Sequence, residues 1–133
     1  MTVSAFAAVS LEPPLVSVCL DERAETRAAV VETGVFAVNV LAVGQEELAQ
    51  RFSQEGNEEQ RFQNLAWRAG ATGAPLLCAA LVNLDCHVIA IHDAGDHALC
   101  IGRVEALEMR PGEPLVYCDG SYCLLTATRG TRG

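Results

Sequence analysis

Short apolar runs separated by turn residues predict strands in the first third of the chain. Residues 2–11, TVSAFAAVSL, combine β-branched with small apolar side chains, and the run stops ahead of a Pro-Pro pair that cannot continue a strand ladder. Residues 15–20, LVSVCL, predict a second strand, and residues 35–43, VFAVNVLAV, predict a third. We therefore expect a β framework to form early in the chain.

Two segments between and after these runs have helical spacing instead. Residues 23–33 predict a helix because alanine and valine recur at helical intervals, with Asp21 placed as an N-cap and Gly34 as the closing glycine. Residues 45–52, QEELAQRF, predict a second, amphipathic helix. Residues 53–73 are polar and contain glycines, and this length indicates either a functional loop or a helix-containing excursion.

The second half of the chain is β-rich. Residues 76–92 and 97–109 predict two long strands, joined by a four-residue hairpin loop at 93–96. Two short strands, LVYC and YCLL, follow after further turns. Strands of this number, with both helices grouped early, predict a mainly β fold with flanking α: an antiparallel barrel with the helices packed on its outside.

Composition limits the class of protein. A chain of 133 residues, half of it hydrophobic and 20% charged, is expected to form one globular domain over residues 1–133. The apolar runs are too short to cross a bilayer, and the chain does not open on a signal-like segment, so we expect a cytoplasmic protein with no membrane partner.

The charge pattern restricts the ligands that the chain can bind. The formal net charge is −8, and all nine basic residues are arginines. Such a chain is expected to repel nucleic acids and anionic membrane surfaces. Any anionic ligand must then be bound by arginine or by backbone N–H groups.

The six cysteines lie mostly within apolar, strand-like segments, and no two of them form a CxxC pair. Disulfide frameworks and zinc sites need tighter, paired spacing. We therefore expect reduced, buried thiols that behave as small hydrophobic side chains.

The segment HDAGDHALCIGRVEAL, residues 92–107, contains the closest grouping of residues that could bind a metal or transfer a proton. Two histidines and two aspartates surround Gly95 within residues 92–97, a set that allows three interpretations. A metal site would require the turn to fold over the ion, and no third histidine or carboxylate pair is near in sequence. The segment could equally be a solvated hairpin tip. In the third interpretation, His97 begins a strand at the rim of the barrel, where it could contact a ligand or transfer a proton.

Two further groups of polar residues are weaker signals. The first strand carries three hydroxyls, at Thr2, Ser4 and Ser10. The first helix begins with a possible anion-binding site formed by Asp21, Arg23 and Thr26. Small residues in strands and polar residues at helix starts are common for structural reasons alone, so neither group identifies a function by itself.

Five segments in the same order and spacing resemble the flavin reductase-like family of the FMN-binding split barrel, the NAD(P)H:flavin oxidoreductases that serve two-component flavin monooxygenases. The segments are TVSAFAAVSLEPPLVSVCLD, FAVNVLAVGQEELAQRFS, GAPLL, HDAGDHALCIGRVEAL and PLVYCDGSYCLL, and they span residues 2–125. The resemblance implies an antiparallel split β-barrel of six or seven strands that acts as a homodimer.

The same resemblance implies positions for the binding residues. The flavin ring would be bordered by Thr2, Val3, Ser4 and Ser10. The ribityl-phosphate arm would be held by Cys19, Leu20, Asp21, Arg23 and Thr26. Asn39 would be a structural or flavin-side hydrogen-bonding residue. Gly95 and Asp96 would lead to His97, the catalytic candidate near the nicotinamide, and Gly120 and Tyr122 would lie close to the same cleft.

The implied activity is the reduction of FMN or FAD by NADH or NADPH, with reduced flavin passed to a separate monooxygenase. The alternative is a flavin-binding module or degenerate subunit of the same fold without reductase activity. Two departures from the family pattern favour that alternative. Ala24 stands where many relatives have serine. Relatives also carry a β-hairpin before the segment that starts at Thr2, whereas here Met1 directly precedes that segment. We expect either a shortened homologue or a natural start upstream.

Overall fold

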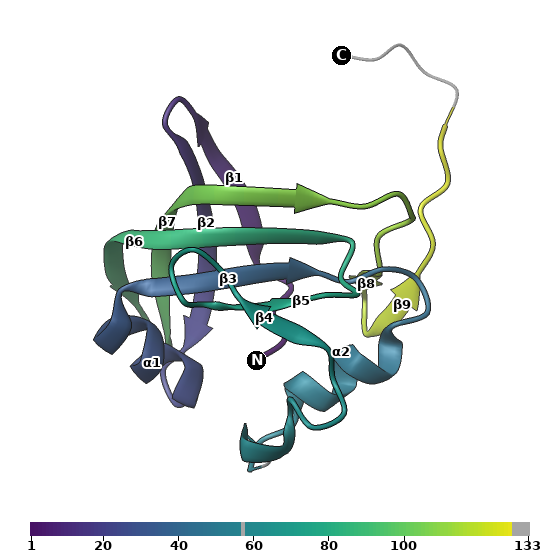
Figure 1. Ribbon diagram of the computed structural model, residues 1–133, viewed down its shortest axis with the longest axis horizontal. Coiled ribbons are helices and arrows are strands. Elements are labelled where there is room, and N and C mark those ends of the chain that lie inside the picture. Colours follow the sequence, from purple (N-terminus) through teal and green to yellow (C-terminus); the bar gives the residue numbers. More distant parts are fainter. Residues whose placement is uncertain (57, 129–133) are drawn as a thin grey trace.

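A curved antiparallel sheet forms the framework of the computed structural model, which describes residues 1–56 and 58–128 (Figure 1). In the described residues this sheet has five strands, in the spatial order β1 (Phe6–Leu11), β2 (Pro14–Asp21), β7 (His97–Met109), β6 (Val82–Ala94) and β3 (Val35–Val40). Two small antiparallel pairs accompany it: β4 (Trp67–Ala69) with β5 (Pro75–Leu77), and β8 (Val116–Cys118) with β9 (Ser121–Cys123). The helical elements are α1 (Glu25–Thr33), α2 (Glu46–Ser53) and the 3₁₀ turn η1 (Glu58–Gln60).

The predicted class, mainly β and antiparallel with early helices, is confirmed. Barrel closure is not seen in the part of the chain that the structure describes, because β1 and β3 remain the two edges of the large sheet. The sheet nevertheless bends. Register shifts at Asp85/Cys86 and Val88/Ala90 interrupt the long β6–β7 ladder, and such bulges increase strand twist and curvature.

The predicted strand over residues 76–92 is wrong, because the structure breaks it in two. Residues 75–77 form β5 and pair with β4, a turn follows in which the Ala80 N–H donates to the carbonyl of Leu77, and β6 starts only at Val82. The predicted four-residue loop is also too long. Ala94 still pairs with His97, so the loop is the two residues Gly95 and Asp96, and Gly95 has the positive φ (64°) that suits the first position of such a loop.

The first helix starts later than predicted, because Asp21 is not its N-cap. Asp21 is the last residue of β2 and pairs with His97 in the β2–β7 ladder. Its carboxylate accepts a hydrogen bond from the backbone N–H of Arg23 (2.8 Å), and Ala24 is the N-cap of α1. The predicted end is confirmed, since Gly34 is left-handed (φ 71°) and its N–H donates to the carbonyl of Val30.

The hydrophobic core lies on one face of the sheet. Alternate residues of β2 and β7 point into it, and Val30 of α1 covers it from one side. Gly102 is required in its centre, because a Cβ there would lie 2.3 Å from the ring of Phe36. The core members are Val16, Val18, Leu20, Val30, Phe36, Leu84, Cys86 and Cys100.

The cysteines differ in exposure, with Cys19 and Cys123 half-buried, so the expectation of buried thiols is only partly correct. All six, each of them in the described part of the chain, are free thiols; Cys86 and Cys100 are buried in the core, whereas Cys78 and Cys118 are exposed. Burial is the main cause that raises the pKa of Cys86 to about 12 and that of Cys100 to about 11. Both therefore stay protonated and unreactive near neutral pH.

A thiol-labelling experiment tests this division. In the native protein we expect a disulfide reagent to modify Cys78 and Cys118 rapidly, while Cys86 and Cys100 react only after denaturant is added. Mass spectrometry of tryptic peptides identifies the labelled positions. Rapid native labelling of Cys86 would contradict the buried position.

None of the helices in the described ranges is long and apolar enough to span a membrane.

Candidate functional site

A cleft of about 640 Å³ opens between the two helices. Its walls come from residues 1–5, the end of β2, residues 23–26 at the start of α1, and the end of α2 with the segment that follows it. His97, the first residue of β7, completes the rim. Figure 1 shows the N-terminus between α1 and α2.

Residues 1–5 leave the sheet and attach to α2, which is why β1 begins at Phe6 and not at Thr2. The Thr2 N–H donates to the carbonyl of Phe52 (3.1 Å), and the Thr2 hydroxyl donates to the carbonyl of Ala49 (2.6 Å). At the other end the Cys19 N–H donates to the carbonyl of Ala5 (3.3 Å). The segment therefore bridges β2 and α2 and exposes backbone and small side chains to the cleft.

The start of α1 offers groups suited to an anion. In the described part of the chain, the N-cap Ala24 makes no side-chain hydrogen bond to the helix. The first N–H groups of a helix have no partner within it, and the helix dipole favours negative charge there. Arg23 and Thr26 line the cleft beside these groups.

His97 is oriented by its neighbour in the β6–β7 turn. Its Nδ1 lies 2.7 Å from Oδ1 of Asp96. This hydrogen bond, followed by the charge of His97, lowers the pKa of Asp96 below its ordinary value. An ionised carboxylate only accepts hydrogen bonds, so Nδ1 carries the proton and Nε2 is the nitrogen left for a ligand. The Glu22 N–H donates to the carbonyl of Asp96 (2.9 Å) and ties this turn to the end of β2.

Most of the residues predicted for the site line this one cleft: Thr2, Val3, Ser4, Cys19, Asp21, Arg23, Thr26 and His97. Gly95 and Asp96 form the adjacent turn. Leu20 does not face the cleft. Side chains alternate along a strand, so Cys19 and Asp21 point to the cleft while Leu20 is buried in the core.

Ser10, Asn39 and Tyr122 are not among the residues that line the cleft. Ser10 pairs with Leu15 beside a register shift in β1, and Tyr122 packs edge-on against Tyr117 in the β8–β9 pair, with ring centroids 5.3 Å apart. The predicted proximity of these residues to the cleft is not found within this chain.

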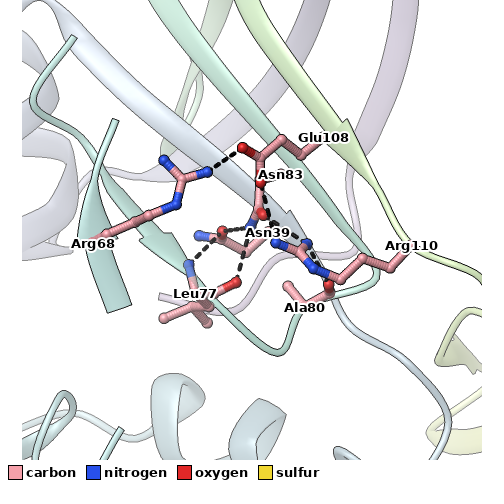
Figure 2. Close-up of polar contacts among 7 residues, drawn as sticks. All are labelled: Asn39, Arg68, Leu77, Ala80, Asn83, Glu108 and Arg110. Carbon is pink, nitrogen blue, oxygen red and sulfur yellow. Dashed lines mark hydrogen bonds and ion pairs between the residues drawn. The ribbon is translucent and has the colours of Figure 1, made fainter. Parts of the chain in front are cut away.

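Asn39 instead belongs to a polar network that joins β3, β5 and β6 (Figure 2). Its Oδ1 accepts hydrogen bonds from Nδ2 of Asn83 (2.7 Å) and from the N–H of Leu77 (3.0 Å). Arg110 extends the network by donating to Oδ1 of Asn83 (2.8 Å) and to the carbonyl of Ala80 (2.9 Å). Of the two predicted roles for Asn39, the structural one matches these contacts.

Sequence reasoning missed the wall formed by α2 and the excursion after it. Phe52, Ser53, Glu55, Gly56 and Arg61 all line the cleft. Phe62 anchors this excursion through its ring contacts with Phe52 (5.3 Å) and Trp67 (5.5 Å). The aromatic residues were a visible signal of packing, but nothing in the local pattern told which polar neighbours they would bury.

Comparisons with known proteins place this chain beside flavin reductases. The flavin reductase like domain model matches residues 1–126. An NADH-dependent flavin reductase of Rhodococcus sp is 44% identical over 122 residues, which are 92% of this chain and 67% of that protein. The reductase subunit HsaB of a flavin-dependent monooxygenase from Rhodococcus jostii is 39% identical over 118 residues, 88% of this chain and 60% of that protein.

A solved structure has the same fold. The NADH:FAD oxidoreductase SgcE6 of Streptomyces globisporus, in complex with NAD and FAD fragments, aligns with a TM-score of 0.89 and 30% identity, over 98% of this chain and 79% of that one. The chain spans roughly two thirds of the length of the two curated relatives described above. With a family model that matches nearly its whole length, this chain belongs to the flavin reductase like domain family.

Proposed function

We propose that this chain is an NAD(P)H-dependent flavin reductase that acts on FMN or FAD. The observation that carries the proposal is the cleft, which brings His97 and most of the predicted flavin-binding residues together. Relatives named NADH-dependent flavin reductase and monooxygenase reductase subunit support it.

The cleft suits a flavin in size and in chemistry. Its volume lies within the range of about 300–1,000 Å³ that is usual for small-molecule sites. The start of α1 offers Arg23, Thr26 and helix N–H groups to a phosphate, and residues 2–4 border the space for a ring. The bound flavin and nicotinamide supply the hydride chemistry themselves.

The protein's own residues bind and orient the reactants. In this proposal Thr2, Val3 and Ser4 border the ring, and the residues from Cys19 to Thr26 hold the phosphate arm. His97 orients the nicotinamide or moves a proton through Nε2, while Asp96 holds the imidazole in place from Nδ1.

The assembly belongs to the proposal as well. We infer a single domain over residues 1–133 that forms a homodimer of split β-barrels. Exposed apolar side chains at the end of β7, Leu107 (54% exposed) and Met109 (72%), support a partner surface there. Reduced flavin would pass to a separate flavin-dependent monooxygenase. Free thiols are compatible with the reducing cytoplasm as its location.

A steady-state assay tests the activity. NADH or NADPH oxidation is followed with FMN, FAD or riboflavin as acceptor, and flavin binding is measured separately by fluorescence. We expect turnover that depends on added flavin. Tight flavin binding without turnover would refute the reductase function and favour a flavin-binding module. Failure to bind any flavin would refute both of these functions.

A further inference from the structure

A carboxylate is fixed in the part of the cleft proposed for the flavin phosphate. Asp21 ends β2, where its backbone pairs with His97, and its side chain lines the cleft beside Arg23. Oδ1 of Asp21 accepts a hydrogen bond from the Arg23 N–H (2.8 Å), and the Asp21 carbonyl accepts one from the Ala24 N–H (3.1 Å). The strand pairing and these two hydrogen bonds determine where the carboxylate lies.

The two other acids that line the cleft, within the residues that the structure describes, are less constrained. Glu25 and Glu55 are exposed, whereas the side chain of Asp21 is 36% exposed. An exposed carboxylate can turn toward water, and its charge is strongly screened. Asp21 is partly shielded from water, so its charge acts more strongly on a nearby ligand. It is therefore the acid that an incoming phosphate would meet in a fixed position.

Asp21 also lies beside the arginine that would bind the phosphate. Nε of Arg23 lies 3.7 Å from Oδ1 of Asp21, and the Arg23 side chain is 84% exposed. An ion pair as exposed as this contributes little, so the guanidinium can turn to a ligand. The carboxylate stays behind, because the Arg23 N–H holds it. A phosphate bound by Arg23 would then lie close to Asp21, and the two negative charges would repel each other.

We propose that Asp21 is a specificity-determining residue of this cleft, which weakens the binding of the flavin phosphate so that the ring provides most of the affinity. The inference rests on the proposed function and deepens it, because it states which part of the flavin the cleft selects. Repulsion by Asp21 offsets the attraction of Arg23 for the phosphate. Flavins with and without the phosphate then bind with similar affinity, and reduced flavin leaves readily for a separate monooxygenase.

Binding measurements on Asp21→Asn test this role. Asparagine has the same shape and keeps an oxygen that accepts the Arg23 N–H, so the variant removes the charge and retains the turn. The dissociation constants of FMN and of riboflavin, which lacks the phosphate, are measured by fluorescence without reductant, at low and at high salt. Glu32→Gln is the matched control, because Glu32 is an exposed acid of the same helix that does not line the cleft.

In the wild-type protein we expect the dissociation constants of FMN and riboflavin to agree within about threefold. Asp21→Asn should tighten FMN by roughly tenfold at low salt and leave riboflavin unchanged. Most of this gain should be lost at about 1 M salt, where charges are screened over only about 3 Å. Glu32→Gln should change neither flavin. A purely structural effect of the substitution would change both flavins together and would persist at high salt.

Unchanged or weaker FMN binding by Asp21→Asn would overturn the proposal, as would an equal change for FMN and riboflavin. If Asp21→Asn does not fold, Asp21→Ser also removes the charge and keeps a side-chain oxygen, and the same gain confined to FMN is expected. NADH oxidation by the wild-type protein with riboflavin shows independently whether the proposed reductase function holds. An active reductase whose Asp21→Asn variant shows no selective gain for FMN would refute this inference alone.

Discussion

Asn83→Ala is expected to lower the free energy of unfolding by about 3 kcal/mol, a large part of the 5–15 kcal/mol that holds an ordinary domain folded. Asn83 is 2% exposed and serves three partners at once (Figure 2). Its Nδ2 donates to Oδ1 of Asn39 and to the carbonyl of Leu77, and its Oδ1 accepts from Arg110. Truncation leaves the buried Leu77 carbonyl and the partly buried groups of Asn39 and Arg110 without this partner, and it opens a cavity.

Chemical denaturation followed by circular dichroism measures the effect. Gln63→Ala is the matched control, since it removes an exposed amide side chain and is expected to change stability by less than about 0.5 kcal/mol. Equal midpoints for Asn83→Ala and the wild type would contradict the network as a stabilising feature.

His97→Ala is expected to lower the rate of flavin reduction by about 100-fold, the lower end of the range for a positioned acid or base. Flavin affinity should change little, because the ring and phosphate contacts come from residues 2–4 and 19–26 in the proposed function. Stopped-flow measurement of flavin reduction at saturating FMN, together with a binding titration, separates the two quantities. The exposed His92, which does not line the cleft, provides the control variant His92→Ala.

An unchanged rate at saturating flavin would exclude the role assigned to His97. The pH dependence gives a second check on its orientation. The pKa of Asp96 is lowered, so the ionised carboxylate is favoured. Its contact with His97 is therefore intact above the ordinary pKa of aspartate and is lost only as the pH falls through the lowered value. We expect no loss of activity from this contact between neutral and mildly acidic pH.

Local patterns predicted elements well where an apolar run ends at a strong break. The Pro-Pro pair ends β1, and Gly34 ends α1 with a left-handed backbone. The run LLCAALV, by contrast, contains no polar residue or glycine, and periodicity could not reveal that it changes partners from β4 to β3 and β7. At the break, Leu77 of β5 is hydrogen-bonded to the side chains of Asn39 in β3 and Asn83 in β6.

Some residues of the candidate site could be predicted from the sequence, and others could not. Residues 2–4, 19–26 and 97 formed recognisable segments, and the structure brings most of them to one cleft. The wall that contains Phe52 and Arg61 was not predicted, because it depends on the tertiary contacts of Phe62 with Phe52 and Trp67. The resemblance to the family allowed a flavin-side or a structural role for Asn39. Its hydrogen bonds to Leu77 and Asn83 match the structural role.

The amino-acid sequence was enough to derive the β-rich antiparallel class, the two early helices, the family and the segment that carries His97. These follow from short-range properties: side-chain periodicity, the restricted backbone of proline and glycine, and motifs in fixed order. The folded structure was needed to learn which polar residues line the cleft and which support the sheet. That decision depends on contacts between segments far apart in the sequence, such as the one between Asn39 and Asn83, which local periodicity does not encode.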